Sequence, residues 1–308
     1  MQTILGSTGV IGRGLALELL PYTTEIRLVS RNPIKINPGD QLLQANLTNK
    51  EEVEKAVEGS EVVYLTAGIK YNIKDWREQW PVIMKNVVES CEKAGAKLVF
   101  FDNVYSYGKV KGRMTEETPY NPCSKKGEVR VKLLDYLMEE VKKGNLQAQV
   151  ARSADFYGPD NRTSFAHIMV FENLNKGKKA QWMLNSDVKH SLTFTPDASK
   201  ATAILGNTDS AYGQVWHMPT DPNALTGKEL IREVASAMGK EARMTTMPRW
   251  MLRMAGLFIP EIKESMEMLY QYNSDYLFVS SKFEKAFDFK ATTYQQGIKE
   301  VVDSMKPV

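Results

Sequence analysis

The stretch GSTGVIG at residues 6–12 follows a short apolar run, QTIL, at residues 2–5. Immediately after it, Ile11, Leu15 and Leu19 recur at the spacing of one helix face. A short apolar run predicts a buried strand, and the apolar stripe predicts a helix that packs on it. The sequence therefore predicts a strand, a glycine-rich turn and a helix in direct succession.

The three glycines of this turn fit a dinucleotide-binding site. Gly6, Gly9 and Gly12 would let backbone N–H groups and the helix N-terminus approach a pyrophosphate. A tight turn with close helix packing would use the same residues, but its place at the first strand-to-helix junction favours dinucleotide binding. The residues of the turn that we expect to contact the cofactor are Gly6, Thr8, Gly9, Val10, Ile11 and Gly12.

Short apolar runs and helical patterns alternate through the first half of the chain. The predicted strands lie at residues 2–5, 26–29, 62–65, 98–101 and 147–151, with a weaker one at 42–43. Thr48 and Glu51 have the spacing of a capping box, which predicts a helix start. This alternation predicts an α/β fold with a Rossmann-type doubly wound parallel sheet.

The alternating pattern ends near residue 155, where shorter mixed segments begin. We expect a dinucleotide-binding domain at residues 1–155, with part of 190–218 returning to it, and a smaller substrate lobe at 156–308. A helix is predicted at residues 225–238. The methionine-rich stretch 244–254 predicts a packing face or a subunit contact, which leaves a homodimer possible.

Composition and charge exclude several classes of protein. A net charge of +3 over 308 residues, with scattered basic residues, predicts neither a nucleic-acid partner nor a membrane-binding face. The motif begins close to the first residue, so we expect no signal peptide, and two cysteines, Cys91 and Cys123, fit a reducing compartment. His167 and His217 lack partners at metal-ligand spacing. We expect a cytoplasmic protein without a bound metal.

The second predicted strand ends in VSRNP, which includes Ser30 and Arg31. An NAD site usually has a carboxylate at this place, where it binds the ribose hydroxyls. An arginine suits a 2′-phosphate instead, although a solvated surface arginine would give the same sequence. The sequence therefore favours NADP over NAD.

Several motifs in the same order resemble the extended short-chain dehydrogenases/reductases, the NAD(P)-dependent epimerases, dehydratases and reductases related to UDP-galactose epimerase. Besides the glycine turn, the similar segments are Asn46–Leu47, TAG at 66–68 (Thr66, Ala67 and Gly68), RSADFYGP at 152–159 and HSLTFTPDASKA at 190–201. The resemblance implies that Asn46 and Leu47 flank the adenine. It also implies a C-terminal lobe that closes over a small-molecule substrate.

The catalytic residues of that family are replaced in this sequence. In FFDNVYSYG at 100–108, Asn103 stands at the family's serine. In NPCSKKGEVR at 121–130, Lys126 stands at the tyrosine and Arg130 at the lysine of Y-x-x-x-K. The family's usual catalytic triad is therefore absent.

The replacements are all polar, which favours catalysis over loss of activity. Lys126 and Arg130 lie four residues apart, on one helix face, where a second cation disfavours protonation of the lysine. Lys126 would then be the acid or base, with Tyr105 as a second candidate. Asn103 could bind a carbonyl oxygen, and Arg130 could bind the nicotinamide ribose. A solvated helix start and simple nucleotide binding remain the alternative.

Two further departures from the family's sequence predict the substrate class. Where nucleotide-sugar enzymes of the family seat the substrate and its diphosphate with asparagine and arginine, this sequence has Asp155 and His190, with Tyr157 nearby. A carboxylate repels a diphosphate, so we expect an atypical NADP-dependent reductase of a small carbonyl or alkene compound. The alternatives are a nucleotide-sugar epimerase or dehydratase, a silent NADP-binding sensor, and a scaffold for other proteins.

Overall fold

The computed structural model describes residues Met1–Lys306 of the chain. These residues form two compact units, each built from separate segments of the sequence. The first unit contains residues 1–106, 125–153 and 198–218, and the second contains residues 107–124, 154–197 and 219–306. No helix within residues 1–306 is long and apolar enough to cross a membrane.

The first unit is built on a seven-stranded sheet in the order β11-β7-β5-β4-β1-β2-β3. Every neighbouring pair in it is parallel. The strands are β1 (Gln2–Leu5), β2 (Ile26–Ser30), β3 (Gln41–Gln44), β4 (Val62–Leu65), β5 (Lys97–Asn103), β7 (Ala148–Ser153) and β11 (Val215–His217). All residues of β1 and β4 are buried, as expected for strands covered on both faces. The predicted α/β fold with a doubly wound parallel sheet is confirmed.

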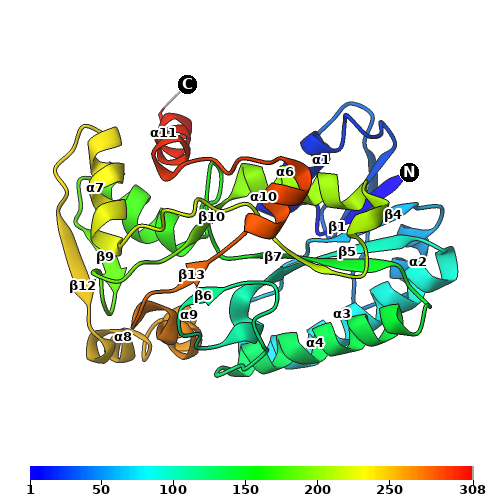
Figure 1. The fold of residues 1–308 in the computed structure, drawn as a ribbon, viewed down its shortest axis with the longest axis horizontal. Coiled ribbons are helices and arrows are strands. Elements are labelled where there is room, and N and C mark those ends of the chain that lie inside the picture. Colours follow the sequence, from blue (N-terminus) through cyan, green and yellow to red (C-terminus); the bar gives the residue numbers. More distant parts are fainter. Residues whose placement is uncertain (307–308) are drawn as a thin grey trace. The chain divides into compact units, whose positions relative to one another are not determined.

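Helices cover both faces of this sheet (Figure 1). One face carries α2 (Lys50–Val57), α3 (Ile73–Ala94) and α4 (Lys125–Lys142), which pack side by side. The other carries α1 (Val10–Glu18) and α6 (Thr195–Gly206), where the Ser199 hydroxyl donates to the Ile11 carbonyl at 3.5 Å. The carboxyl ends of the strands therefore meet at one edge, between the two layers of helices.

The predicted start of α2 was wrong by one residue. The helix is capped by Asn49, whose side chain accepts a hydrogen bond from the Glu52 amide, and no capping box joins Thr48 to Glu51. The Thr48 hydroxyl donates instead to the Asn46 side chain at 3.0 Å. The Thr48 hydroxyl is therefore engaged by Asn46, and the helix begins at Lys50, after the Asn49 cap.

The second unit contains three short parallel strand pairs. These are β8 (Asp155–Tyr157) with β10 (Leu192–Phe194), β9 (Ala180–Met183) with β12 (Met244–Met247), and β6 (Arg113–Met114) with β13 (Leu277–Phe278). The helices are η2 (His167–Glu172), α5 (Asn173–Asn175), α7 (Gly227–Ala237), α8 (Arg249–Ala255), α9 (Pro260–Ser265), η4 (Met266–Tyr272), α10 (Ser281–Phe287) and α11 (Tyr294–Ser304). A buried aromatic and aliphatic cluster that includes Tyr157, Trp182 and Ile298 forms its core.

The helix predicted at residues 225–238 is α7. Its first turn is closed by a capping box in which Thr226 and Glu229 satisfy each other's backbone N–H groups. The strong apolar stripe of α7 packs on the core of the second unit through Leu230, Ile231 and Val234.

Candidate cofactor and active site

A cavity of about 620 Å³ opens at the carboxyl edge of the sheet, where β1, β2 and β4 end. In open parallel sheets this edge is where ligands bind, next to the point at which the strand order reverses. The residues predicted for the cofactor that line it are Gly6, Thr8, Gly9, Ser30, Arg31, Asn46, Leu47, Ala67 and Gly68. The turn after β1, the end of β2 and the segment after β4 thus share one pocket.

Each glycine of the turn meets a different constraint. Gly6 has φ +98, and a Cβ there would lie 2.4 Å from the Ala67 Cα atom. A Cβ on Gly12 would lie 2.6 Å from the Gly6 carbonyl oxygen, whereas one on Gly9 would meet nothing closer than 3.5 Å. Gly6 and Gly12 are therefore required by the fold, while Gly9 leaves open space on the pocket wall. This bare backbone fits the close approach of a pyrophosphate.

The remaining predicted contacts of the turn lie behind this wall. Gly9 is the N-cap of α1, and it has no side chain that could accept hydrogen bonds from the first N–H groups of the helix. These N–H groups are therefore suited to bind an anion. Val10 begins the helix, and Ile11 is buried beneath it. The Thr66 hydroxyl lies 3.3 Å from the Leu5 carbonyl and supports the turn.

The other end of the pocket carries positive charge. Arg31 is exposed there, and the Ser30 hydroxyl accepts a hydrogen bond from the Asn32 amide at 3.2 Å. Lining residues that sequence reasoning missed include Asn32, Ala45, Thr48, Ile69, Lys70, Asp75, Gln79 and Ile83. Most of the missed residues come from the connection between β4 and α3 and the first turns of α3. The contribution of this connection could have been found by extending the TAG segment at 66–68 toward the next helix.

Beyond Lys70, the same connection contributes Tyr71 to a cluster of polar side chains. Lys126, at the start of α4, is fully buried, with its ammonium 4.6 Å from the centre of the Tyr71 ring. The hydroxyl of Tyr71 lies 3.3 Å from that of Tyr105, and the Tyr105 amide donates to the Asn103 side chain at 3.0 Å. Two of the predicted catalytic residues, Lys126 and Tyr105, therefore meet at Tyr71, which the sequence did not reveal, and Asn103 is joined to Tyr105 through its backbone amide. The cluster offers an ammonium and two phenols as proton donors.

Arg130 lies beside this cluster, against an aromatic wall. Its guanidinium is 4.2 Å from the Trp80 ring centre and 4.9 Å from that of Trp76. One nitrogen lies 3.6 Å from the Asp102 carboxylate, whose other oxygen accepts from Arg152 at 3.0 Å. Burial lowers the pKa of Arg130 and Asp102 raises it, and an arginine so placed keeps its charge. Asp102 is therefore the carboxylate partner of two buried guanidinium groups.

In the second unit, the predicted substrate residues Asp155 and His190 lie side by side. The His190 Nε2 atom is 3.0 Å from the Asp155 carboxylate, and its Nδ1 atom is 3.3 Å from the Gln271 carbonyl. The imidazole stacks on Tyr272 at 4.6 Å. Both partners of the imidazole are oxygen atoms that can accept a hydrogen bond. Hydrogen bonds and ring stacking therefore hold the His190 imidazole beside Asp155.

Tyr157, the third residue predicted for substrate, lies in the core of the second unit. Its ring stacks on Tyr294 at 5.5 Å and packs against Phe194. Burial raises its pKa well above the usual value, so the phenol stays neutral. Its hydroxyl has no hydrogen-bond partner within residues 1–306. The side chain therefore fills the core.

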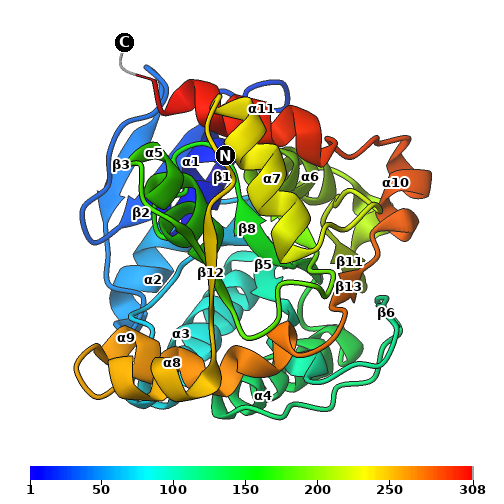
Figure 2. The ribbon, with the colours of Figure 1, turned by 90° about the vertical axis from the view of Figure 1, so that its left-hand side faces the viewer.

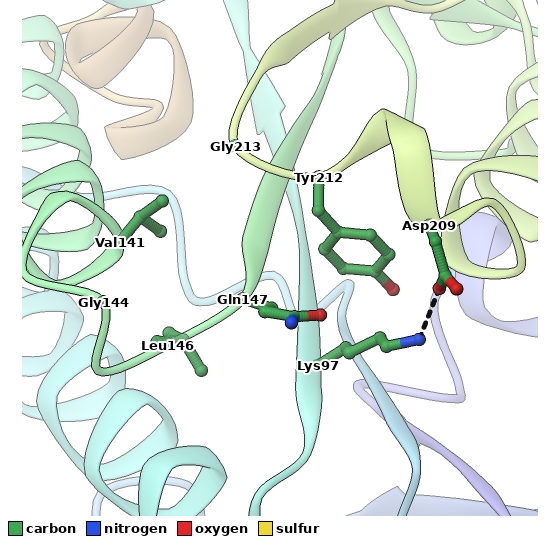
Figure 3. A pocket seen from close by; sticks show the side chains of 8 residues that line it. All are labelled: Lys97, Val141, Gly144, Leu146, Gln147, Asp209, Tyr212 and Gly213. Atoms are coloured by element: carbon green, nitrogen blue, oxygen red, sulfur yellow. Dashed lines mark hydrogen bonds and ion pairs between the residues drawn. The ribbon is translucent and has the colours of Figure 1, made fainter.

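A second cavity of about 640 Å³ lies at the opposite edge of the sheet, where β5 and β7 begin (Figure 3). Lys97 and Asp209 form an ion pair of 2.6 Å in it, and Lys97 also faces the Tyr212 ring. The rest of the lining is Val141, Gly144, Leu146, Gln147 and Gly213. An exposed ion pair of this kind supplies no acid–base constellation, so the cavity at the carboxyl edge is the candidate site.

Residues 3–218 match the family described as NAD dependent epimerase/dehydratase family. The chain belongs to this family. The expected resemblance to the extended short-chain dehydrogenases/reductases is thereby confirmed, and so is the enzyme class at the level of the family. A nicotinamide dinucleotide is the cofactor that the family's description specifies.

Solved structures of this family are similar over nearly the whole chain. One is the UDP-glucuronic acid 4-epimerase from Bacillus cereus in complex with NAD, with a TM-score of 0.81 and 15% identity over 99% of this chain and 98% of that chain. Another is the dTDP-glucose 4,6-dehydratase from Bacillus anthracis str. Ames with NAD, with a TM-score of 0.81 and 18% identity over 98% and 95%. At these identities the similarity shows the fold alone.

A third similar structure is the UDP-glucose 4-epimerase of Thermus thermophilus with NAD, with a TM-score of 0.78 and 18% identity over 99% of this chain and 98% of that chain. Among curated protein sequences, none matches this chain.

The glycine turn generates a matched pair of variants. Gly12→Ala places a Cβ against backbone atoms, so we expect a loss of about 1–3 kcal/mol in stability. Gly9→Ala leaves the melting temperature of the free protein unchanged but weakens dinucleotide binding by about tenfold or more, because its methyl group lies on the pocket wall. Thermal unfolding and fluorescence titration measure the two effects. Equal binding by Gly9→Ala and wild type would contradict this assignment of the pocket.

A second prediction concerns the buried charge cluster of Asp102, Arg130 and Arg152. Asp102→Asn leaves Arg130 and Arg152 without their carboxylate, which we expect to destabilise the protein by about 3–5 kcal/mol. Asp209→Asn is the control, because it removes a carboxylate whose side chain is 87% exposed and we expect no measurable change. The shift in urea midpoint distinguishes them. Similar midpoints for the two variants would show that Asp102 has no such role.

Proposed function

We propose that this protein is a cytoplasmic NADP-dependent oxidoreductase that reduces a small carbonyl or alkene substrate. The observation that carries the proposal is the cluster of Lys126, Tyr71 and Tyr105. Lys126 stands at the position of the catalytic tyrosine of the extended short-chain dehydrogenases/reductases, and the hydroxyls of Tyr71 and Tyr105 would be further proton donors near it. The family supplies the cofactor class, because its members depend on a nicotinamide dinucleotide.

The pocket at the carboxyl edge would hold the cofactor. Gly9 and the N-terminus of α1 would receive the pyrophosphate, and Arg31 would bind the 2′-phosphate that distinguishes NADP from NAD. Asn46 and Leu47 line the same pocket and would flank the adenine. When bound, the nicotinamide ring supplies the hydride donor or acceptor.

The chain's own residues would handle the proton. The Lys126 Nζ atom lies over the aromatic face of Tyr71, and its protonated form would give a proton to a substrate oxygen. The Tyr105 hydroxyl is the rival donor, and its contact with Tyr71 could pass a proton between the two phenols. The Asn103 oxygen is occupied by the Tyr105 amide, so its side-chain nitrogen would bind the substrate oxygen.

Arg130 would act differently from the family's lysine. Its guanidinium is engaged by Asp102 and by the rings of Trp76 and Trp80. A side chain held in this way positions the start of α4, and with it Lys126. We therefore propose that Arg130 supports the site, and that the nicotinamide ribose is bound mainly by other groups.

A nucleotide-sugar epimerase or dehydratase is the second candidate. It is favoured by the fold similarity, because the similar solved structures include a UDP-glucuronic acid 4-epimerase and dTDP-glucose 4,6-dehydratases. The Asp155–His190 pair argues against it, since a partly exposed carboxylate disfavours an anionic diphosphate. A small, less anionic substrate fits these residues better.

Arg31→Asp tests the cofactor preference. We expect NADP to bind about 10- to 100-fold more weakly to this variant, because a charge-assisted contact is replaced by repulsion, while NAD affinity changes little. Lys35→Asp makes the same charge change at an exposed residue outside the pocket and serves as control. Fluorescence titration with both dinucleotides measures the ratio. Wild-type protein that binds NAD at least as tightly as NADP would refute the role of Arg31.

Lys126→Met tests the proton donor. Turnover of a panel of small carbonyl compounds with NADPH should fall about 10²- to 10⁴-fold, the usual contribution of a general acid, while NADP affinity stays nearly intact. Lys126→Tyr should restore little activity, because Asn103 has replaced the serine. Tyr105→Phe, measured in parallel, should retain more activity than Lys126→Met.

Three outcomes would change this account. If Tyr105→Phe loses activity and Lys126→Met does not, Tyr105 is the acid. If the panel also contains UDP- and dTDP-sugars and only these are converted, the second candidate is correct. If wild-type protein binds NADP tightly yet converts nothing in the panel, the sensor hypothesis is favoured.

A further inference from the structure

Large apolar side chains are exposed together on one short segment of the second unit. They are Trp250 (65% exposed), Met254 (54%), Leu257 (73%), Phe258 (81%) and Ile259 (45%). The segment, residues 249–265, contains α8, the loop 256–259 and α9, and we call it the apolar hairpin. Figure 2 shows α8 and α9 next to each other near the lower end of β12. Such a concentration of exposed apolar surface marks an interaction site.

The loop of the apolar hairpin is ordered by its own backbone. The amides of residues 256–259 donate to the carbonyl groups of Leu252, Met254 and Ala255 at 2.9–3.2 Å. Gly256 allows the close packing, because a Cβ there would lie 3.2 Å from the Lys263 Cα atom. These four amides are therefore satisfied internally, and the loop could enter an apolar phase without exposing unpaired donors.

Positive charge accompanies the exposed apolar side chains of α8 and the loop 256–259. Residues 242–260 include Arg243, Arg249 and Arg253 and no aspartate or glutamate. All three arginines are exposed. The first carboxylate after the loop belongs to Glu261, at the start of α9. Arg243 pairs with Glu241 at 3.6 Å, and α9 adds Glu261, Lys263 and Glu264, so the apolar hairpin has a net charge of +1. Arg249 and Arg253 lie among the exposed apolar side chains, a combination that suits an anionic, apolar surface.

We propose that the apolar hairpin docks on the surface of a membrane that contains anionic lipids. Leu257 and Phe258 would lie among the upper acyl carbons, and Trp250 at the headgroup level, where its indole is favoured. Arg249 and Arg253 would bind lipid phosphates. Glu261 lies just beyond the loop, so insertion would be shallow.

A second copy of this chain is a less suitable occupant. A stable protein interface involves roughly 20–30 residues on each side, many more than the loop and α8 provide. Two copies related by twofold symmetry would also bring the same three arginines toward each other. The overall charge and the lack of a long apolar run predicted no membrane partner, because neither feature reports the exposure of individual side chains in a folded hairpin.

The protein carries its own reporter for the test. Trp250 is exposed, whereas Trp76, Trp80, Trp182 and Trp216 are buried, at 1–6% exposure. Vesicles of phosphatidylcholine with phosphatidylglycerol should shift the wild-type tryptophan emission to the blue and sediment with the protein. Vesicles of phosphatidylcholine alone should bind about tenfold less, and added salt should weaken binding to the anionic vesicles. Trp250→Phe should bind but lose the emission shift.

Matched variants distinguish docking through the apolar hairpin from nonspecific binding to vesicles. The double variant Leu257→Glu with Phe258→Glu should lose vesicle binding by about tenfold or more while keeping the wild-type melting temperature. Leu17→Glu makes the same kind of change at a side chain that is 53% exposed on α1, and it should bind like wild type. Arg249→Gln with Arg253→Gln should abolish the preference for anionic vesicles.

Absence of both sedimentation and emission shift with anionic vesicles would overturn the proposal. Equal binding by wild type and the double glutamate variant would overturn it as well. A dimer detected by light scattering that dissociates in Phe258→Glu, in protein that ignores vesicles, would identify a second copy as the occupant. None of these outcomes depends on the cofactor or on turnover, so the proposal stands or falls apart from the proposed enzymatic function.

Discussion

The pocket at the carboxyl edge of the sheet depends on the close approach of two backbone segments at the ends of β1 and β4. Gly6, in the left-handed region at φ +98, lies so near Ala67 that any Cβ would overlap the neighbouring backbone. Gly12 allows α1 to pack equally closely on the same turn. Because both contacts are made by backbone, the position of the pocket is fixed before any ligand binds. The side chains that follow β2 and β4 then only have to line a site that already exists.

The altered catalytic residues form a consistent set when their environment is considered. Asp102 at the end of β5 binds two buried arginines, and the aromatic rings on α3 cover one of them. An arginine at position 130 suits this arrangement better than a lysine, because a planar guanidinium can stack and pair at the same time. The start of α4 is thereby held in place, and Lys126 is directed onto Tyr71. Loss of the family's usual residues has left an ordered polar site.

The sequence was most informative where the backbone is buried or specialised. The strands were predicted because both faces of a parallel sheet are covered, so each strand is a continuous apolar run such as VVYL at 62–65. Tyr71 and Trp76 could not be predicted as site residues, because their role arises from the way α3 packs on α4. The capping error at α2 arose because the Thr48 hydroxyl donates to Asn46, and Asn49 caps the helix by accepting from the Glu52 amide. The methionine-rich stretch 244–254, which overlaps the apolar hairpin, was interpreted as a packing face or a subunit contact, since periodicity alone does not separate buried from exposed apolar residues.

The most direct test of the account is a crystal structure of the complex with NADP. The account predicts the pyrophosphate against Gly9 and the N-terminus of α1, and the 2′-phosphate in contact with Arg31. It also predicts that the C4 atom of the nicotinamide faces the space bordered by Lys126 and Tyr105. A nicotinamide ring that lies away from both residues would contradict the proposed chemistry, and a 2′-phosphate in solvent would contradict the proposed cofactor.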